Sequence, residues 1–415
     1  QEANSIAGLD SIHFNIPGTG VQTIAPASPL PDIQDDIIID GYTQPGAAPN
    51  TLAVGSDAVL LIELNGAGIG GNGPVLSLLA SNSEIRGLVI NRGPGAGIDV
   101  AEENNVIAGN FIGVAPDGAT PLGNAGDGVF VANLFQLPSN TNTRIGGPDP
   151  ADRNIISGNG YNSDPFNQRN GMTLDQVQST TIQNNYIGVD RTGMLPVGNA
   201  KTGIGIYRGA YHVVDGNVIS ANTLGAFGMG QDDPLAVNSG VTIIQNIIGM
   251  NAQEDGYLAN GSYGLFIQST DAPVNAVIVN NTIAGNAGPG IYLSGNVIGS
   301  TQISRIHHNA GPGIALIGGA QNYLTANSFT DNDGLGIDLG YDGLTFNHAG
   351  AIAGPNSYQN YPLIELASAG AGDLRVAGTL PAPDGSYRIE FFRNDACDPT
   401  QFGEGQTYIG FVNAT

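Results

Sequence analysis

Two stretches of the sequence share one pattern: NVIAGNFIGVAPDGATPLGNAGDGVFV (residues 105–131) and TIQNNYIGVDRTGMLPVGNAKTGIGIY (residues 181–207). Both contain I-x-x-N-x-I, in which another branched or large apolar residue can replace either isoleucine. The pattern occurs at Ile107/Asn110/Ile112, Ile182/Asn185/Ile187, Val214/Asn217/Ile219, Ile243/Asn246/Ile248, Ile278/Asn281/Ile283 and Leu324/Asn327/Phe329. A catalytic site is expected to occur once in a chain, so this repeated pattern indicates a structural scaffold.

A second asparagine often stands four residues before a strand of the form Gly-apolar-x-apolar. Asn286, Asn309 and Asn332 are such residues, and they follow one another at intervals of 23. A period near 23 built from short strands and Gly/Asn turns is typical of a solenoid. We therefore expect each coil to contribute two or three short strands, whose inward Ile, Val and Leu stack from coil to coil within parallel sheets.

The repeated asparagines have a structural explanation. Asparagine tolerates left-handed backbone at a turn, and its side chain can bond backbone groups or the asparagine one coil away. The sequence predicts that Asn185, Asn217, Asn246 and Asn281 stack in one turn. They are expected to stabilise the fold rather than to take part in catalysis.

The coils come in two lengths. Asn286 follows Ile283 by three positions in a short coil, whereas Asn124 follows Ile112 by twelve positions in a long one. Long and short coils alternate, so the extra residues are always inserted at the same register position. We expect the three resulting loops to lie on one edge of the solenoid, two coils apart, at residues 113–123, 188–198 and 249–259.

Composition excludes several kinds of partner. The 415 residues include 36 acidic and 12 basic side chains, and Lys201 is the single lysine. Nucleic acids and anionic membrane surfaces both need clustered cations, so neither is expected as a partner. Cys397 is the single cysteine and excludes an intrachain disulfide. No apolar run reaches the length of a membrane span, so this segment is not expected to insert into a membrane.

The repeat divides the chain into three parts. Residues 1–36 lack it and are expected to form N-terminal capping strands, residues 37–345 to form the solenoid, and residues 346–415 to form a small antiparallel β-sandwich-like module. In the last part, alternating strands flank a Pro383-Asp384-Gly385 turn. The chain begins with Gln1, and we expect it to be part of a longer polypeptide.

The sequence resembles secreted bacterial surface proteins with right-handed parallel β-helix repeats, a pectate-lyase-like solenoid scaffold. The stretches that carry the resemblance are FNIPGTGVQTI, SPLPDI, IIIDGYTQPGAAPNT, IRGLVIN, IGGPDPADRNIISGN, GLGIDLG and FFRNDACD. The resemblance implies an all-β, extracellular, right-handed parallel β-helix followed by a β-sandwich-like module, and it implies no activity. The family usually has acidic residues in the segment after GIDLG, where this chain has His348, Ala351 and Ala353.

Parallel β-helices often carry carbohydrate-active enzymes, so we searched for paired carboxyls. Asp99 and Asp175 are about two coils apart, and Asp232 and Asp233 are adjacent in GMGQDDP. These four are weak catalytic candidates, and we commit to no catalytic residue. No cofactor is required by the pattern. Calcium is a weak alternative at five acids that are more simply explained as solvated: Asp117, Asp190, Asp255, Asp331 and Asp333.

Aromatic side chains give a second kind of candidate site. Phe130, Phe266 and Tyr292 occupy one outward stripe, with Tyr207 and Phe227 expected near it. Exposed aromatics along a flat sheet can stack on sugar rings, and the structural alternative is that a loop covers them. We therefore expect a non-enzymatic structural or adhesive β-helix, at the cell surface or secreted, that binds a glycan or another surface protein. The alternative is a glycoside hydrolase or polysaccharide lyase acting on a largely neutral polysaccharide.

Overall fold

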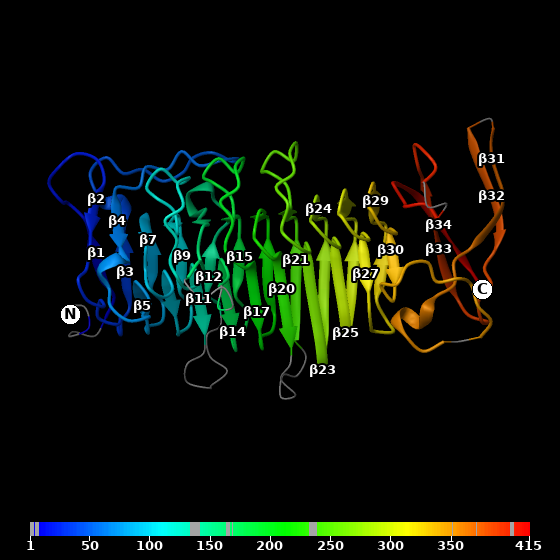
Figure 1. Ribbon diagram of the computed structural model, residues 1–415, viewed down its shortest axis with the longest axis horizontal. Helices are drawn as coiled ribbons and strands as arrows, with labels where there is room; N and C mark the ends of the chain where they lie inside the picture. The colour runs from blue at the N-terminus through cyan, green and yellow to red at the C-terminus, as the bar shows by residue number, and fades with distance from the viewer. Residues whose placement is uncertain are drawn as a thin grey trace.

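The computed structural model describes residues 4, 8–132, 142–162, 167, 169–231, 239–350, 352–370, 372–398 and 402–415. The chain winds into a right-handed parallel β-helix that runs along the long axis of Figure 1, followed by two small antiparallel sheets. The predicted fold class is confirmed. Three parallel faces of 10 or 11 strands enclose the core, and each coil visits face 1, face 2 and face 3 in that order.

Each face is a stack of short strands, one per coil. Face 1 consists of Asp10–His13 (β1), Ile37–Asp40 (β3), Glu84–Arg86 (β6), Val106–Ala108 (β9), Arg144–Gly146 (β12), Thr181–Gln183 (β15), His212–Asp215 (β18), Ser239–Ile244 (β21), the later parts of Leu265–Val279 (β23) and Ile291–Gln302 (β25), and Tyr323–Thr325 (β28). Face 2 consists of Gln22–Ile24 (β2), Ile62–Asn65 (β4), Leu88–Asn91 (β7), Phe111–Ile112 (β10), Ile155–Ile156 (β13), Tyr186–Ile187 (β16), Val218–Ile219 (β19), Ile247–Ile248 (β22), Thr282–Ala284 (β24), Arg305–His307 (β26) and Ser328–Thr330 (β29). Face 3 consists of Leu76–Leu78 (β5), Ile98–Val100 (β8), Val129–Ala132 (β11), Met172–Asp175 (β14), Thr202–Tyr207 (β17), Gly225–Gln231 (β20), the earlier parts of β23 and β25, Ile314–Leu316 (β27) and Ile337–Leu339 (β30).

The described helices are single 3-10 turns: Gly41–Thr43 (η1), Gly66–Gly68 (η2), Pro150–Asp152 (η3) and Pro355–Tyr358 (η4). None of the helices in the described part is long and apolar enough to span a bilayer. At the N-terminus, β1 and β2 pair in parallel with β3 and β4, so the segment before residue 37 already continues faces 1 and 2.

The core is a set of apolar columns that run along the helix axis. On face 1, one column joins Ile107, Ile145, Ile182, Val214 and Ile243 through the strand register. All five side chains are fully buried. Burying one such side chain contributes about 1.5–3 kcal/mol, so the columns are the main source of stability.

Two asparagine ladders follow the corners of the coil. Between faces 1 and 2, a ladder runs along Asn110, Asn154, Asn185, Asn217, Asn246 and Asn281, and from Asn154 on each side chain accepts hydrogen bonds from the backbone and side-chain amides of the asparagine one coil before. The predicted stack is confirmed. A second ladder between faces 2 and 3 runs along Asn124, Asn159, Asn199, Asn222, Asn260, Asn286, Asn309 and Asn332.

The three long loops rise from one edge of the helix, as predicted, and they touch (Figure 1). Arg191 N donates to Gly118 O at 2.8 Å, and Ala252 N donates to Gly193 O at 2.9 Å. Loop residues such as Val189 pack on the outer side of face 2, where they form a second apolar cluster: Ala58, Leu60, Val89, Phe111, Val114, Ile155, Tyr186, Val189, Val197, Val218 and Ala252. The loops therefore cover face 2.

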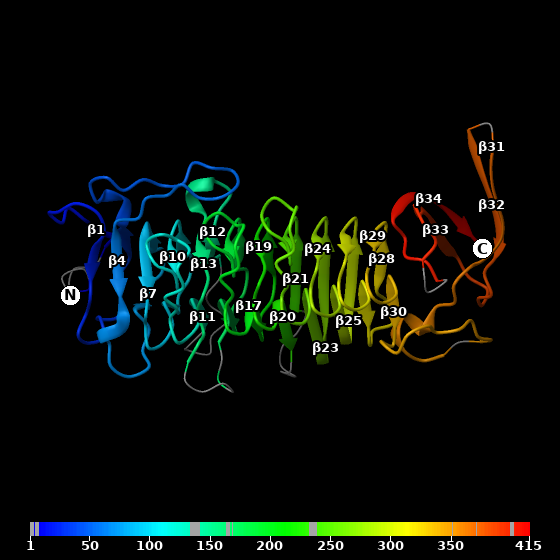
Figure 2. The ribbon, with the colours of Figure 1, turned by 45° about the horizontal axis from the view of Figure 1, so that its top comes forward.

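A strap, residues 44–59, runs along this same edge and across several coils (Figure 2). Two arginines bind its carbonyl oxygens. The Arg153 guanidinium donates to the carbonyls of Leu52, Ala53 and Gly55, and that of Arg191 donates to those of Ser56 and Ala58. Arg153 also stacks on Tyr186, with 4.6 Å from the guanidinium carbon to the ring centroid. Side chains between 98 and 135 residues away in sequence thus hold the strap.

The C-terminal module consists of two hairpins. Leu363–Gly370 (β31) pairs with Asp373–Thr379 (β32), and Tyr387–Arg393 (β33) pairs with Thr407–Ala414 (β34). The strands that flank the Pro383–Gly385 turn therefore do not pair with each other, contrary to what the sequence suggested. The tight turn after β31, where Gly372 has φ +92°, instead folds β32 back on β31.

The second hairpin ends the solenoid. Glu404 accepts a hydrogen bond from the Asn332 side chain at 2.6 Å and so ends the second asparagine ladder. Glu390 accepts from the backbone amide of Ala326 at 2.8 Å. Phe329 N also donates to Gly405 O at 2.9 Å, which satisfies a backbone group of the last face-2 strand. The module is therefore attached to the helix end by polar contacts.

Candidate functional site

The outer side of face 3 presents a single line of side chains, one from each coil. The strand register places them in the order Asp99, Phe130, Thr173, Gly205, Gly228, Phe266, Tyr292, Ala315 and Asp338. Phe227, which we expected near this line, is fully buried in the core, and Gly228 takes the outward position. The expectation was wrong because Phe227 is in register with Leu265, whereas a simple glycine alignment pairs it with Phe266.

An aromatic stack occupies the middle of the line. The Phe266 and Tyr292 rings are stacked, with 5.1 Å between centroids and 17° between planes. Tyr263 extends the stack at 5.1 Å from Phe266, and Tyr341 meets Tyr292 edge-on at 5.8 Å. We call Tyr263, Phe266 and Tyr292 the aromatic platform. All three rings are partly exposed, so the platform presents aromatic surface to solvent.

The other two aromatic candidates lie apart from the platform. Phe130 is partly exposed and lies four strands from Phe266, or ~19 Å at ~4.8 Å per strand. Tyr207 is 38% exposed and follows Gly205 by two residues on β17. Sequence reasoning missed Tyr263; its place three residues before Phe266 was the available signal.

Glycines form the surface beside the platform. A Cβ at Gly225 would lie 2.1 Å from the Tyr263 ring, so that glycine is required for the ring to pack. A Cβ at Gly228 would come no closer than 3.5 Å to any atom, and one at Gly230 would meet nothing within 4 Å. Strand β20 therefore has bare backbone on its outer side.

A pair of carboxyls lies at the N-terminal end of the line. Burial, reinforced by the neighbouring Asp127 charge, raises the pKa of Asp99 to about 7. Burial also raises the pKa of Asp127 to about 6, although hydrogen bonds from Asn170 N and the Thr173 hydroxyl oppose the shift. The Oδ1 atom of Asp99 is buried and accepts no hydrogen bond from the residues that the structure describes. Asp127 was not among the candidates, because its proximity to Asp99 depends on the stacking of β8 on β11.

The other acidic candidates have different surroundings. Asp175 forms an ion pair with Arg208, with 2.8 Å between Oδ2 and Nη2. The carboxylate that acts on Asp99 is thus Asp127 rather than Asp175. Asp232 and Asp233 lie outside the described residues.

The calcium candidates in the long loops have local hydrogen-bond partners. Asp117 accepts from the backbone amides of Ala119 and Thr120, and Asp190 from those of Met194 and Leu195. These bonds hold the tips of the loops.

The remaining calcium candidates are dispersed. Asp255 accepts from the Asn251 side chain at 2.7 Å, and Asp331 lies 3.7 Å from His308 Nε2. Asp333 is exposed. The described part of the chain contains no group of three or more His, Cys, Asp or Glu side chains arranged to hold a metal ion.

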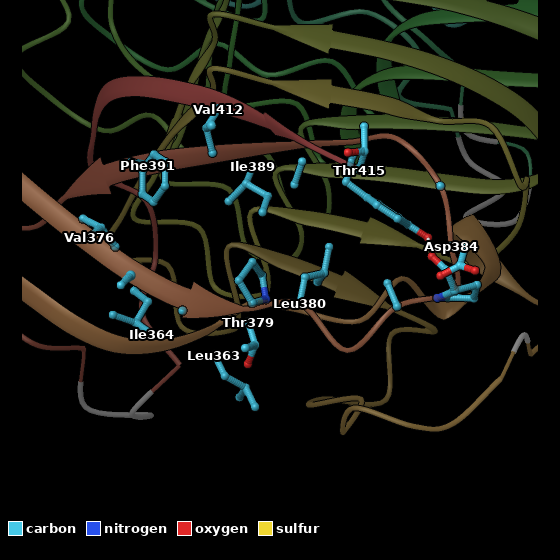
Figure 3. Close-up of a pocket in the computed structure, with 18 residues that line it drawn as sticks. Leu363, Ile364, Val376, Thr379, Leu380, Asp384, Ile389, Phe391, Val412 and Thr415 are labelled. Atoms are coloured by element: carbon cyan, nitrogen blue, oxygen red, sulfur yellow. Dashed lines mark hydrogen bonds between the residues drawn. The ribbon is translucent and has the colours of Figure 1, made fainter.

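A groove of about 560 Å³ opens between the two C-terminal hairpins (Figure 3). Its lining is mostly apolar and includes Leu363, Ile364, Val376, Ile389 and Phe391. The groove lies between two separate two-stranded sheets. It therefore resembles the open interior of a small sandwich more than a polar binding site, and the face-3 line is the better candidate.

A match to one sequence family agrees with the fold. Residues 139–343 match the sequence family described as a right-handed β-helix region. The solved A-module of the mannuronan C-5 epimerase AlgE6 from Azotobacter vinelandii is 15% identical, with a TM-score of 0.40 over 76% of this chain and 72% of that chain. The AlgE4 A-module of the same organism is 12% identical, with a TM-score of 0.33 over 79% and 68%. ORF18 of Geobacillus virus E2 is 11% identical, with a TM-score of 0.37 over 100% and 70%. No curated protein matched the sequence.

The fold defines the chain as a right-handed parallel β-helix protein with a small antiparallel module at its C-terminal end. At these identities and TM-scores, the similar solved structures carry no information about activity.

Proposed function

We propose that this protein is a glycan-binding β-helix segment of an extracellular or cell-surface bacterial protein. The aromatic platform on the outer side of face 3 is the observation that carries the proposal. Phe266 and Tyr292 are stacked at 5.1 Å and partly exposed. The C–H faces of pyranose rings stack on aromatic rings, and partly exposed aromatics on a rigid sheet bind without a large loss of conformational freedom.

The charge of the chain favours a neutral glycan. The formal net charge is −24 at pH 7, which repels polyanions. The partly exposed Asp99 carboxyl group suits hydroxyl groups as partners, since a carboxylate oxygen accepts hydrogen bonds. A neutral, hydroxyl-rich polysaccharide is thus the ligand class that fits both the rings and the acids.

The scaffold suits a binding surface that has to stay in place. Continuous strand pairing and two asparagine ladders couple each coil to the next, so the face-3 line is held on regular strands. The long loops pack on face 2 and leave face 3 free of them. We propose that the helix acts as a stiff spacer that presents face 3.

One observation favours a second function, that of a carbohydrate-active enzyme. The pKa of Asp99 is raised to about 7 beside the second carboxyl of Asp127. A carboxyl that is partly protonated near neutrality can donate a proton to a glycosidic oxygen. Asp127 is only 7% exposed, so the pair offers one accessible acid rather than two, and we prefer the binding function.

A glycan array followed by titration calorimetry tests the proposal. The wild-type protein is expected to bind at least one neutral glycan, and the Phe266→Ala/Tyr292→Ala variant is expected to lose that binding. Tyr323→Ala is the matched control, because Tyr323 is 50% exposed on face 1. Equal binding by the platform variant and the wild type would refute the proposal. Release of reducing ends from the bound glycan, abolished by Asp99→Ala, would instead establish the enzyme.

A further inference from the structure

A second row of outward side chains runs beside the aromatic platform. Outward positions on a strand are two residues apart, so the residue two positions after Phe266 also faces away from the core. The strand register orders this second row as Tyr207, Gly230 and Gln268, one from each of three successive coils. Tyr207 is 38% exposed, and Gly230 and Gln268 are partly exposed. The row is therefore open to solvent next to the platform.

Gly230 differs from two other glycines near this row. A Cβ at Gly205 would lie 3.2 Å from Tyr207 Cε2, and a Cβ at Gly225 would overlap the Tyr263 ring, so tyrosine packing accounts for both glycines. At Gly230, an added Cβ would have none of the described atoms within 4 Å. Glycine inside a strand is unfavourable compared with β-branched residues, and it often marks a place where a ligand approaches closely. A ligand against Gly230 would explain a residue that internal packing does not.

Gly230 forms the floor of a notch that is one coil wide. Tyr207 precedes it in the row and Gln268 follows it, so the two flanking strands are ~9–10 Å apart. The Gln268 amide makes no hydrogen bond with the residues that the structure describes, so its donors and its acceptor are available. Asp175, which is in register with Tyr207, is paired with Arg208 at 2.8 Å. The notch therefore offers an aromatic side chain and a neutral hydrogen-bonding group.

Resting on the glycan-binding function proposed above, we propose that the bound glycan contains N-acetylated amino sugars and that one acetamido group occupies the Gly230 notch. The acetamido methyl packs on Tyr207, and the acetamido amide forms a hydrogen bond with the Gln268 amide. A hydroxyl at the same position of the sugar is shorter and carries no methyl, so it leaves the aromatic side chain uncovered. The acetamido group is uncharged, which agrees with a chain of net charge −24.

Two series of neutral oligosaccharides test this inference. Oligomers of N-acetylglucosamine and of glucose with the same linkage and length differ only in the acetamido group that replaces one hydroxyl of each sugar. Titration calorimetry is expected to show that the wild type binds the N-acetylglucosamine series at least about tenfold more tightly, because one hydrogen bond and one buried methyl together contribute about that factor. Phe266→Ala/Tyr292→Ala should weaken the binding of both series.

Two substitutions locate the preference at the notch. Gly230→Val fills the notch and should abolish the preference, with an unchanged or raised melting temperature, since the added groups meet open space and valine favours a strand. Gln268→Leu keeps a side chain of similar size without the amide, so it should reduce the preference severalfold. Gly240→Val, on the outer side of face 1, is the matched control and should keep the full preference.

The outcomes separate this inference from the function on which it rests. Equal affinity of the wild type for the two series, or an undiminished preference in either the Gly230→Val or the Gln268→Leu variant, would overturn the inference. If Phe266→Ala/Tyr292→Ala still abolished glycan binding in that case, the proposed function would stand. If the wild type bound no glycan at all, both would fail.

Discussion

Replacing Asn217 with alanine should weaken the helix at one coil. The Asn217 side chain is fully buried, and its Nδ2 donates to Ile182 O at 2.9 Å, Asp215 O at 3.1 Å and Asn246 Oδ1 at 3.0 Å. Its Oδ1 accepts from Asn185 N at 2.9 Å and from Asn185 Nδ2 at 3.0 Å. Alanine removes all five hydrogen bonds and leaves the space of the amide group empty.

The magnitude follows from the groups left without partners. Asn185 Nδ2 keeps its bonds to Ile145 O and Gln183 O, and Asn246 Oδ1 still accepts from Asn217 N. The Ile182 carbonyl stays within the parallel β15–β18 ladder, so the backbone N–H of Asn185 is the buried group that loses its described partner. Such a loss costs about 1–3 kcal/mol, so the free energy of unfolding should fall by ~1–3 kcal/mol.

Chemical denaturation measures the loss, and hydrogen exchange locates it. Exchange should accelerate first at Asn185 and in the adjoining coils, because a solenoid couples mainly nearest neighbours. Asn275→Ala is the control: this asparagine is exposed on β23 and has no left-handed backbone, so its loss should change stability by less than ~1 kcal/mol. An Asn217→Ala variant as stable as the wild type, with unchanged exchange at Asn185, would refute the ladder as a source of stability.

Three further predictions concern the strap, the buried acid and the loops. Arg153→Met should leave the strap carbonyls unpaired and make residues 44–59 sensitive to protease, whereas Arg144→Met, at a half-exposed ion pair, should not. The raised pKa of Asp99, about 7 against an ordinary 3.8, means that ionisation destabilises the fold. The destabilisation is absent below pH 3.8, grows between pH 3.8 and 7 and is complete above it, with an upper bound of about 4 kcal/mol. Asp99→Asn should therefore raise the melting temperature at pH 8 and have no such effect at pH 3; a gain only in acid would contradict the assignment. Deleting nine residues from the 188–198 loop should lower the free energy of unfolding by several kcal/mol, since it uncovers the apolar outer side of face 2. An unchanged melting temperature would show that the loop is not structural.

The sequence alone was enough to predict the repeating part of the fold. Each coil has the same local features: an apolar side chain facing inward, an asparagine at the corner and a strand of a few residues. Residues such as Asn217 and Ile219 contact the equivalent residues of an adjacent coil, so the spacing along the sequence predicts the pattern. The common edge of the three long loops followed from the same arithmetic.

Sequence reasoning found part of the candidate site. The outward line that contains Phe266 and Tyr292 was predicted, because alternation along a strand fixes which side chains face outward. The line was misread at Phe227, where Ala226 takes the position held by Gly264 in the next coil and shifts the register by one. A one-residue shift exchanges the two faces of a strand, so an irregular coil cannot be placed by pattern alone.

Only the tertiary structure decided the contacts between distant segments. The Arg153 guanidinium reaches the carbonyl of Gly55, and Asp127 lies beside Asp99 only because β11 stacks on β8. In the C-terminal module, β32 pairs with β31 and not with β33, although the sequence predicts a strand on either side of β32. Such contacts depend on three-dimensional distance and burial, which no local spacing encodes. The stacking of the repeated coils can therefore be predicted from the sequence. The features that depart from the repeat depend on which residues the folded coils bring into contact.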